Sequence, residues 1–255
     1  MVYFWVGLAL STECPALLEQ GRIAFEARKL EVAAQRFGDA ARDCADKPAA
    51  LVALSQVQFL LGKEVEAERS LKLALAANPD HGESIYALGR IYYHQHRYQE
   101  AVSQFLNLVA MEPRNYRAHD NLALCYDVLN RDADAARHFK RALDLVMKEH
   151  PEYDWAHVNF ADFFLKREKY EEAFQLAAEA ARRNPASARN AFLTGKALVK
   201  LEKPELALRW LETAVKLDEK HGESWYLLAQ LYRRMGRGED AAAALGRFKE
   251  AGERK

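Results

Sequence analysis

The chain has 255 residues, of which 37 are basic and 37 are acidic, so its formal net charge is zero. Half of the residues are hydrophobic and 29% are charged, which excludes an intrinsically disordered chain. The zero net charge argues against a protein that binds nucleic acid through its overall electrostatic field. With only 12 glycines and 7 prolines the chain lacks the turn residues of an all-β protein, so we expect nearly all of it to be helical.

The first element is an uncharged, apolar segment at residues 1–13. Val2–Leu10 has the length of a signal-peptide core, and Gly7 and Ala9 resemble the small residues of a cleavage site. The basic residues that should precede such a core are missing. The segment is therefore either a truncated signal or anchor, or a tail that packs onto the first helix. No apolar run reaches the roughly 18 residues of a membrane span, and the sequence leaves a cytoplasmic and an exported or periplasmic location open.

The three cysteines, Cys14, Cys44 and Cys125, are too few for a disulfide-rich scaffold or a structural zinc site. Cys14 begins the first predicted helix and Cys44 ends the second, and antiparallel helices bring those two ends together. A bridge between them would suit an exported protein, whereas two unpaired thiols would suit a cytoplasmic one. Cys125 falls on the packed side of a helix and is predicted to be a small core residue.

A period of 34 residues runs along the rest of the chain. It is set by alanines that begin a helix after a short polar turn: Ala33, Ala67, Ala101, Ala135, Ala173, Ala207 and Ala241. Apolar residues follow most of them at offsets of four and seven, which is one face of an α-helix. Twelve residues before each alanine lies a small residue: Gly21, Ser55, Gly89, Ala123, Ala161, Gly195 and Ala229. The sequence therefore predicts a helix–turn–helix repeat in seven copies.

These copies resemble the tetratricopeptide repeat over about residues 14–253. The third copy carries the family pattern as Ile85-x-x-Leu88-Gly89-x-x-Tyr92, followed by Ala101, Phe105 and Pro113. The resemblance implies an all-α fold, an α–α superhelix or right-handed solenoid of about seven repeats over 14–255. The expected repeats are 14–47, 48–81, 82–115, 116–153, 154–187, 188–221 and 222–255. Within each, we expect the small residue of the first helix to face the alanine of the second.

The spacing is broken once, because Ala135 and Ala173 lie 38 residues apart. The four additional residues are close to one helical turn. Ala142–His150 continues in helical period until Pro151, so we predict that the second helix of the fourth repeat is about one turn longer. Trp155 would then either project at the rim of a binding groove or seal the local core.

No catalytic or cofactor-binding motif accompanies the repeats. The identical segments His81–Ser84 and His221–Ser224 lie at the entries of first helices, where Gly turns the chain and Glu and Ser suit the helix N-terminus. His94 and His96 are two residues apart, whereas a helical metal pair needs three or four. We therefore expect no enzymatic activity, no cofactor and no metal site.

In the family, a concave surface is formed by the second, fifth, sixth, ninth, twelfth and thirteenth residues of each repeat. Rigid aromatic residues recur at these positions, and basic residues collect toward the C-terminal half, a mixture that suits an extended, acidic peptide. The resemblance thus implies a partner-binding groove formed by Tyr86, Arg90, Tyr93, Arg117, Asn121, Trp155, Asn159, Lys166, Arg189, Phe192, Lys196, Tyr226 and Arg233. The alternative is that some of these aromatic residues belong to the core.

Asn121 and Asn159 both occupy the sixth position of adjacent repeats. This is similar to the asparagine ladder by which O-linked N-acetylglucosamine transferase holds peptide backbones, because an amide both donates and accepts hydrogen bonds. The alternative is two surface amides without a ligand. The clamp by which some family members hold the acidic C-termini of chaperones needs a set of lysine, asparagine and arginine residues that no three consecutive copies supply.

The sequence favours a non-catalytic protein–protein interaction scaffold that binds an extended peptide or partner protein in the groove. The alternative is a regulatory or substrate-presenting subunit of an enzyme complex, for example in envelope biogenesis or glycan transfer. An RNA-binding repeat is disfavoured by the zero net charge and by the absence of a repeated two-residue code at groove positions.

Overall fold

The protein is represented by a computed structural model that describes residues 6–44, 46–150 and 153–253. Every regular element in these ranges is an α-helix, and the predicted all-α superhelical fold class is confirmed. The chain divides into two compact units, Met1–Arg131 and Asp132–Lys255. No helix in the described part of the chain is both long and apolar enough to cross a membrane.

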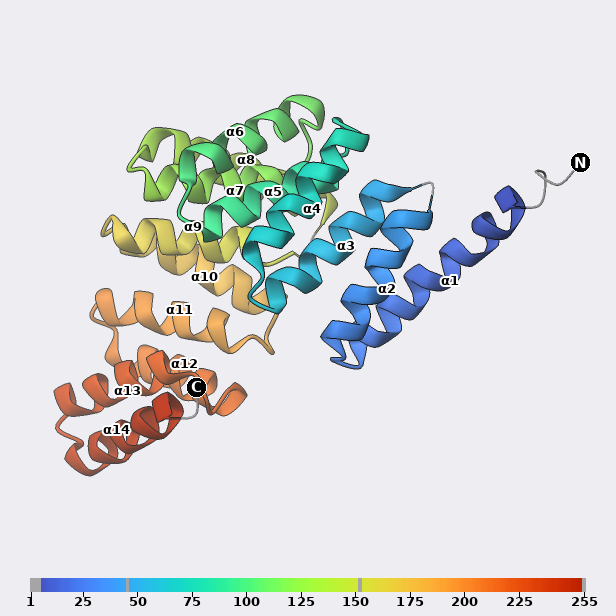
Figure 1. Cartoon of the computed structure of the whole chain (residues 1–255). Helices are drawn as coiled ribbons and strands as arrows, with labels where there is room; N and C mark the ends of the chain where they lie inside the picture. The colour runs from blue at the N-terminus through green and yellow to red at the C-terminus, as the bar shows by residue number, and fades with distance from the viewer. Residues whose placement is uncertain (1–5, 45, 151–152, 254–255) are drawn as a thin grey trace, which may run out of the picture. The chain divides into compact units, whose positions relative to one another are not determined.

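The N-terminal unit contains helices α1 to α7. They are α1 (Val6–Glu26), α2 (Leu30–Asp43), α3 (Lys47–Leu60), α4 (Glu64–Ala77), α5 (Gly82–His94), α6 (Tyr98–Met111) and α7 (Tyr116–Val128). Figure 1 shows α1 beside α2, α3 beside α4 and α5 beside α6, each as a helical hairpin. Within this unit each hairpin also packs against the next helix along the chain.

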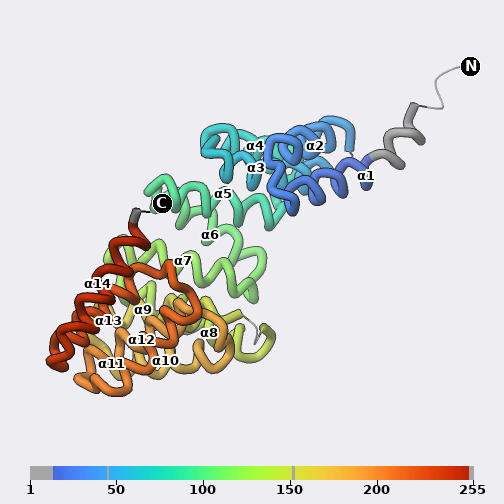
Figure 2. The backbone as a smooth tube through the Cα atoms, turned by 90° about the horizontal axis from the view of Figure 1, so that it is seen from below, coloured from blue at the N-terminus to red at the C-terminus, as the bar shows by residue number. Residues whose placement is uncertain are grey.

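The C-terminal unit contains helices α8 to α14. They are α8 (Asp132–Glu149), α9 (Trp155–Lys166), α10 (Tyr170–Arg183), α11 (Ala188–Lys200), α12 (Pro204–Leu217), α13 (Gly222–Arg234) and α14 (Gly238–Glu253). The last four form two hairpins, α11 with α12 and α13 with α14 (Figure 2). We keep the seven predicted repeat ranges as a proposal, and the two units meet in sequence within the fourth.

Two predictions, one about the length of a helix and one about where a helix begins, have different outcomes. The predicted extra turn is confirmed, because α8 has 18 residues whereas α2, α4, α6, α10 and α12 have 14 each. The prediction that Cys14 begins the first helix is wrong, because α1 already begins at Val6 and carries Pro15 in its interior. The residues before Cys14 include leucine and alanine, which favour helix, and the helix continues through Pro15. Residues 1–5 of the apolar segment lie outside the described residues.

Each hairpin depends on a small residue of its first helix, but the partner of that residue differs from our expectation. A Cβ added to Gly89 would lie 2.7 Å from the ring of Phe105, and one added to Gly21 would lie 2.5 Å from the ring of Phe37. These distances are too short for a real Cβ, so glycine is what allows the two helices to approach. The small residue therefore faces the large side chain of the second helix, four residues beyond the fully buried alanine, such as Ala101.

The second residue beyond the end of each first helix has a positive φ. These residues are Arg28, Gly62, His96, Asn130, Glu168, Glu202 and Gly236, with φ between 56° and 75°. The following N–H donates to a carbonyl five residues earlier, as from Lys29 to Ala24 at 2.9 Å, which is a Schellman cap. Gly62 and Gly236 favour this conformation and Asn130 and His96 tolerate it, so the sequence carries no such signal only at Arg28, Glu168 and Glu202.

We predict that Glu168→Gly and Glu202→Gly each raise the free energy of unfolding by about 0.5–1 kcal/mol, because the left-handed conformation penalises a residue with a Cβ. Urea denaturation of the intact chain measures the change. The matched controls Gly62→Ala and Gly236→Ala should lower stability by a similar amount. Glycine substitutions that destabilise both glutamate turns would contradict the assignment.

The structure pairs Cys14 of α1 with Cys44, which follows α2, in a disulfide with its Cα atoms 5.3 Å apart. The sequence left open whether Cys14 and Cys44 are bridged or are two unpaired thiols, and the structure has them bridged. Ala40 and Ala50 pack around the bridge in a small apolar cluster. Cys125 is fully buried, as predicted, and burial raises the pKa of its thiol to about 12, so it reacts slowly in the folded protein.

Protein purified from its native host without reductant should show one free thiol per chain in denaturant, that of Cys125, and three after reduction. Reduction should lower the free energy of unfolding by about 2–4 kcal/mol, because the bridge restricts the unfolded chain. A Cys14→Ser, Cys44→Ser double variant is the control and should not respond to reductant. Three thiols before reduction would rule out the bridge.

A buried polar cluster joins α9, α10 and α11. Asp154 Oδ2 accepts hydrogen bonds from Asn184 Nδ2 at 3.0 Å and from Asn190 Nδ2 at 2.7 Å. His157, whose backbone N–H donates to the carbonyl of Asp154, is only 1% exposed, and its Nδ1 has no hydrogen-bond partner among the described residues. Burial, assisted by the charge of Arg183, lowers the pKa of His157 to about 4.

This histidine should make the protein sensitive to acid. Its pKa in the folded state is below the ordinary value of 6.5, so the unfolded state binds the proton more readily. The contribution of His157 is complete above about pH 6.5 and is lost as the pH falls toward 4, by on the order of 3 kcal/mol. Urea midpoints measured across this range should fall less steeply for His157→Gln than for the unmodified chain. His96→Gln, at an exposed histidine, is the control, and equal slopes for all three proteins would contradict the prediction.

Candidate partner-binding site

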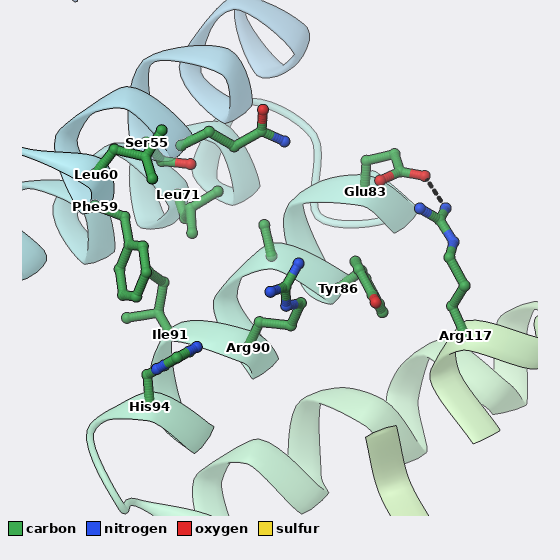
Figure 3. Close-up of a pocket in the computed structure, with 12 residues that line it drawn as sticks. Ser55, Phe59, Leu60, Leu71, Glu83, Tyr86, Arg90, Ile91, His94 and Arg117 are labelled. Carbon is green, nitrogen blue, oxygen red and sulfur yellow. Dashed lines mark hydrogen bonds and ion pairs between the residues drawn. The ribbon is translucent and has the colours of Figure 1, made fainter. Parts of the chain in front are cut away.

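The N-terminal unit has a hollow of about 320 Å³ between α3, α5 and the start of α7 (Figure 3). Its lining residues are Ser55, Gln56, Phe59, Leu60, Leu71, Glu83, Tyr86, Ala87, Arg90, Ile91, His94 and Arg117. Most of them stand at the concave positions that the family resemblance implies. Three residues predicted for the groove, Tyr86, Arg90 and Arg117, are therefore brought together here.

One side of this hollow is apolar. Phe59 and His94 lie with their ring centroids 4.8 Å apart, and Ile91 lies beside Phe59 (Figure 3). Leu60 is 52% exposed, so it has apolar surface available for a ligand. The sequence reasoning did not single out Leu60 or Ile91, because it searched the concave positions for aromatic and charged residues.

The other side is a polar network. Glu83 and Arg117 form an ion pair, and the guanidinium of Arg117 lies 4.8 Å from the centre of the Tyr86 ring. The amide of Asn121 donates to the Tyr86 hydroxyl at 3.1 Å and to the carbonyl of Arg117 at 2.9 Å. Burial raises the pKa of Tyr86, so its hydroxyl stays protonated near neutral pH.

Arg90 lies between these two sides (Figure 3). Its side chain is exposed, and it forms no ion pair with any described residue, whereas Glu83 and Arg117 neutralise each other. The hollow of the N-terminal unit therefore presents one uncompensated positive charge next to an apolar surface.

The C-terminal unit has a second hollow, of about 380 Å³, on its first helices. It is lined by Asp162, Arg189, Phe192, Leu193, Lys196, His221 and Glu223. The guanidinium of Arg189 stacks 4.5 Å above the ring of Trp155, and neither Arg189 nor Lys196 forms an ion pair within the described ranges. Lys166, also predicted for the groove, pairs with Asp162 at 2.9 Å. This hollow is more polar than the first.

The two His-Gly-Glu-Ser segments lie at helix N-termini, and in the second one the histidine side chain caps the helix. His221 Nδ1 accepts a hydrogen bond from the backbone N–H of Ser224 at 3.2 Å, so the ring proton is on Nε2. His81 Nδ1 lies 2.8 Å from the hydroxyl oxygen of Ser84. Gly82 and Gly222 are the first residues of α5 and α13, and neither has a positive φ.

The remaining predicted groove residues are not gathered in these hollows. Tyr93 is half-buried against Tyr98, with ring centroids 5.4 Å apart. Tyr226 is 47% exposed and contacts Phe248 at 5.4 Å, and Arg233 is exposed. Trp155 is 46% exposed, so it does not seal the local core.

Phe192 matches the alternative that some of the aromatic residues belong to the core. It is only 7% exposed and belongs to the hydrophobic core of the C-terminal unit, although it also lines the hollow. At the fifth position of the repeat a ring can turn toward the next helix, and here it packs against His221 at 5.0 Å. Asn159 is also buried, and the amide of Asn121 donates to the Tyr86 hydroxyl, and the asparagine ladder stays a prediction.

No group of three or more histidine, cysteine or acidic side chains in the described part of the chain is arranged to hold a metal ion. The two hollows present charged groups, hydrogen-bond donors and apolar surface. Side chains of these kinds are suited to binding a flexible polypeptide chain.

Two family profiles match the sequence. One, described as "Tetratricopeptide repeat", matches residues 18–82 and 86–150, which together make up half of the chain. The other, described as "Anaphase-promoting complex, cyclosome, subunit 3", matches residues 166–248. The two profiles cover most of the sequence.

Among curated proteins, the chain is similar to protein O-mannosyl-transferase TMTC3 of Mus musculus, with 26% identity over 170 residues. The match covers 62% of this chain and 18% of the mouse protein. The human protein of the same name gives 26% identity over 167 residues, again 18% of its length. The chain thus spans about a fifth of the curated relatives that it matches.

Among solved structures, the chain is similar to a tetratricopeptide repeat protein from Parabacteroides merdae, with 18% identity, a TM-score of 0.72, and coverage of 96% of this chain and 95% of that one. It is also similar to YrrB, described as a TPR protein with an unusual peptide-binding site, with 19% identity, a TM-score of 0.53, and coverage of 75% and 97%. At these identities the likeness concerns the fold alone. Together with the profile match over half of the sequence, it shows that the chain belongs to the tetratricopeptide repeat family.

Proposed function

We propose that the chain is a non-catalytic protein-interaction scaffold that holds an extended peptide or partner protein on the first helices of its repeats. The observation that carries this proposal is that the concave positions of neighbouring repeats line a hollow in each of the two units. The proposal is supported by the fold, and by YrrB, a protein of similar fold that is described as having a peptide-binding site.

The charges at these positions favour an acidic partner. Arg90, Arg189, Lys196 and Arg233 have no ion pair among the described residues, although the chain as a whole carries no net charge. Cations that are not neutralised within the protein attract and orient acidic groups, and they raise the rate of association. The uncompensated positive charge is therefore concentrated at these concave positions, and the protein as a whole has no excess of positive charge.

A second candidate is a regulatory or substrate-presenting subunit of an enzyme complex. It is favoured by the match to two proteins described as O-mannosyl-transferases, of which this chain spans 18%. The two candidates share the binding surface and differ in what the bound protein does. Only the second predicts that the chain changes the rate of a transferase acting on the bound partner.

The exposed aromatic residues of the C-terminal unit provide the test. Peptides are selected from a displayed random library on the intact chain, and their affinities are measured by fluorescence anisotropy. Trp155→Ala and Tyr226→Ala should each weaken binding by about tenfold or more, because large aromatic side chains dominate peptide interfaces. Their thermal midpoints should change little, since both side chains are about half exposed.

Leu206→Ala is the matched control, because Leu206 is 47% exposed but lies on α12, a second helix. It should bind the selected peptides as the unmodified chain does. Selected peptides that bind both aromatic variants with unchanged affinity would contradict a binding surface on the first helices of the C-terminal unit. A library from which no peptide binds the chain would contradict the peptide-binding function itself.

A further inference from the structure

We propose that the hollow of the N-terminal unit selects a carboxylate next to a large apolar side chain in the bound segment. This inference rests on the proposed peptide-binding function and names the chemistry that one of its sites recognises. It follows from the different character of the two sides of the hollow and from the position of Arg90 between them.

The apolar side provides a subsite for one side chain. Phe59, Leu60, Ile91 and the fully buried Leu71 contribute the apolar part of the lining (Figure 3). The hollow of about 320 Å³ has room for a large aliphatic or aromatic side chain. Burial of such a side chain removes apolar surface of both partners from water, including that of the half-exposed Leu60.

Arg90 provides the charge. A guanidinium presents parallel N–H groups that match the two oxygens of a carboxylate, so recognition is bidentate. The neighbouring apolar surface excludes water when a ligand binds, and this strengthens the ion pair. Lysine or amide groups on a ligand cannot form the same contact.

The other charged groups around the hollow do not compete for the ligand carboxylate. Arg117 is neutralised by Glu83 and stacks on Tyr86. The His94 ring packs against Phe59 at an interplanar angle of 59° and lies on the apolar side. Arg90 is thus the position at which a ligand carboxylate gains an ion pair without displacing one within the protein.

The carboxylate can come from two sources, the side chain of aspartate or glutamate, or the free C-terminus of a partner. The shared chemistry is a carboxylate adjacent to an apolar side chain. Synthetic peptide pools separate the sources. Four pools consist of nonapeptides with an amidated C-terminus, degenerate flanks and a fixed central pair, which is Leu-Glu, Leu-Gln, Ala-Glu or Leu-Lys. Two further pools end in leucine, one with a free and one with an amidated C-terminus.

Fluorescence anisotropy of these labelled pools with the intact chain gives the affinities. For a side-chain carboxylate, the Leu-Glu pool should bind about tenfold more tightly than the Leu-Gln, Ala-Glu and Leu-Lys pools. For a terminal carboxylate, the free leucine pool should show the same advantage over its amidated form. Either result supports the inference, and equal affinity of all pools overturns it.

Variants connect the preference to the hollow. Arg90→Gln should abolish the discrimination of Leu-Glu from Leu-Gln, or of free from amidated leucine, and Arg90→Glu should reverse the charge preference in favour of Leu-Lys. Leu60→Ser should reduce only the preference for Leu-Glu over Ala-Glu. The matched controls are Arg69→Gln and Leu73→Ser on α4, since Arg69 is exposed without an ion pair among the described residues, and Leu73 is 52% exposed like Leu60.

The outcomes separate this inference from the proposed function. If selected peptides bind and depend on Trp155 and Tyr226, but ignore Arg90 and Leu60, the scaffold function stands and the carboxylate inference is overturned. A carboxylate preference that survives in Arg90→Gln also overturns it. If no pool and no library peptide binds, the proposed function fails together with the inference.

Discussion

The contact between a small residue on the first helix of a repeat and a large side chain on the second is the constraint on which the fold depends. At Gly89 and Phe105 the contact leaves no room for a Cβ, so the two helices can approach only because glycine is present. The same relation recurs at Gly21 and Gly195. Because this contact fixes one face of the first helix against the second, the remaining face is left for a ligand.

The two hollows show how one backbone plan supports different chemistry. Both are formed by the same repeat positions, yet Phe59 and Leu60 make the first largely apolar, whereas Asp162 and Lys196 make the second polar. Zero net charge is compatible with both, since acidic residues at these positions can be neutralised locally, as Glu83 is by Arg117. Specificity in such a scaffold therefore depends on which charges are left uncompensated, and not on the total charge.

Much of the fold could be predicted from the sequence, because the period of 34 residues repeats the same packing requirement in every copy. The longer α8 was predictable for the same reason, since four additional residues without a helix breaker make about one turn. The turns at Arg28 and Glu168 were not predictable, because the Schellman bonds impose positive φ on residues that show no preference for it. The burial of Phe192 was not predictable either, because a concave position does not determine which way a ring points.

The claim that first helices carry the binding surface is tested most directly by mapping a bound peptide onto the intact chain. Backbone amide NMR spectra, recorded with and without a library-selected peptide, report which helices change environment. For a peptide bound in the N-terminal unit, the account predicts the largest shifts around Phe59 on α3 and Arg90 on α5. Shifts confined to the second helices, for example around the exposed Leu73 of α4 and Leu106 of α6, would contradict it.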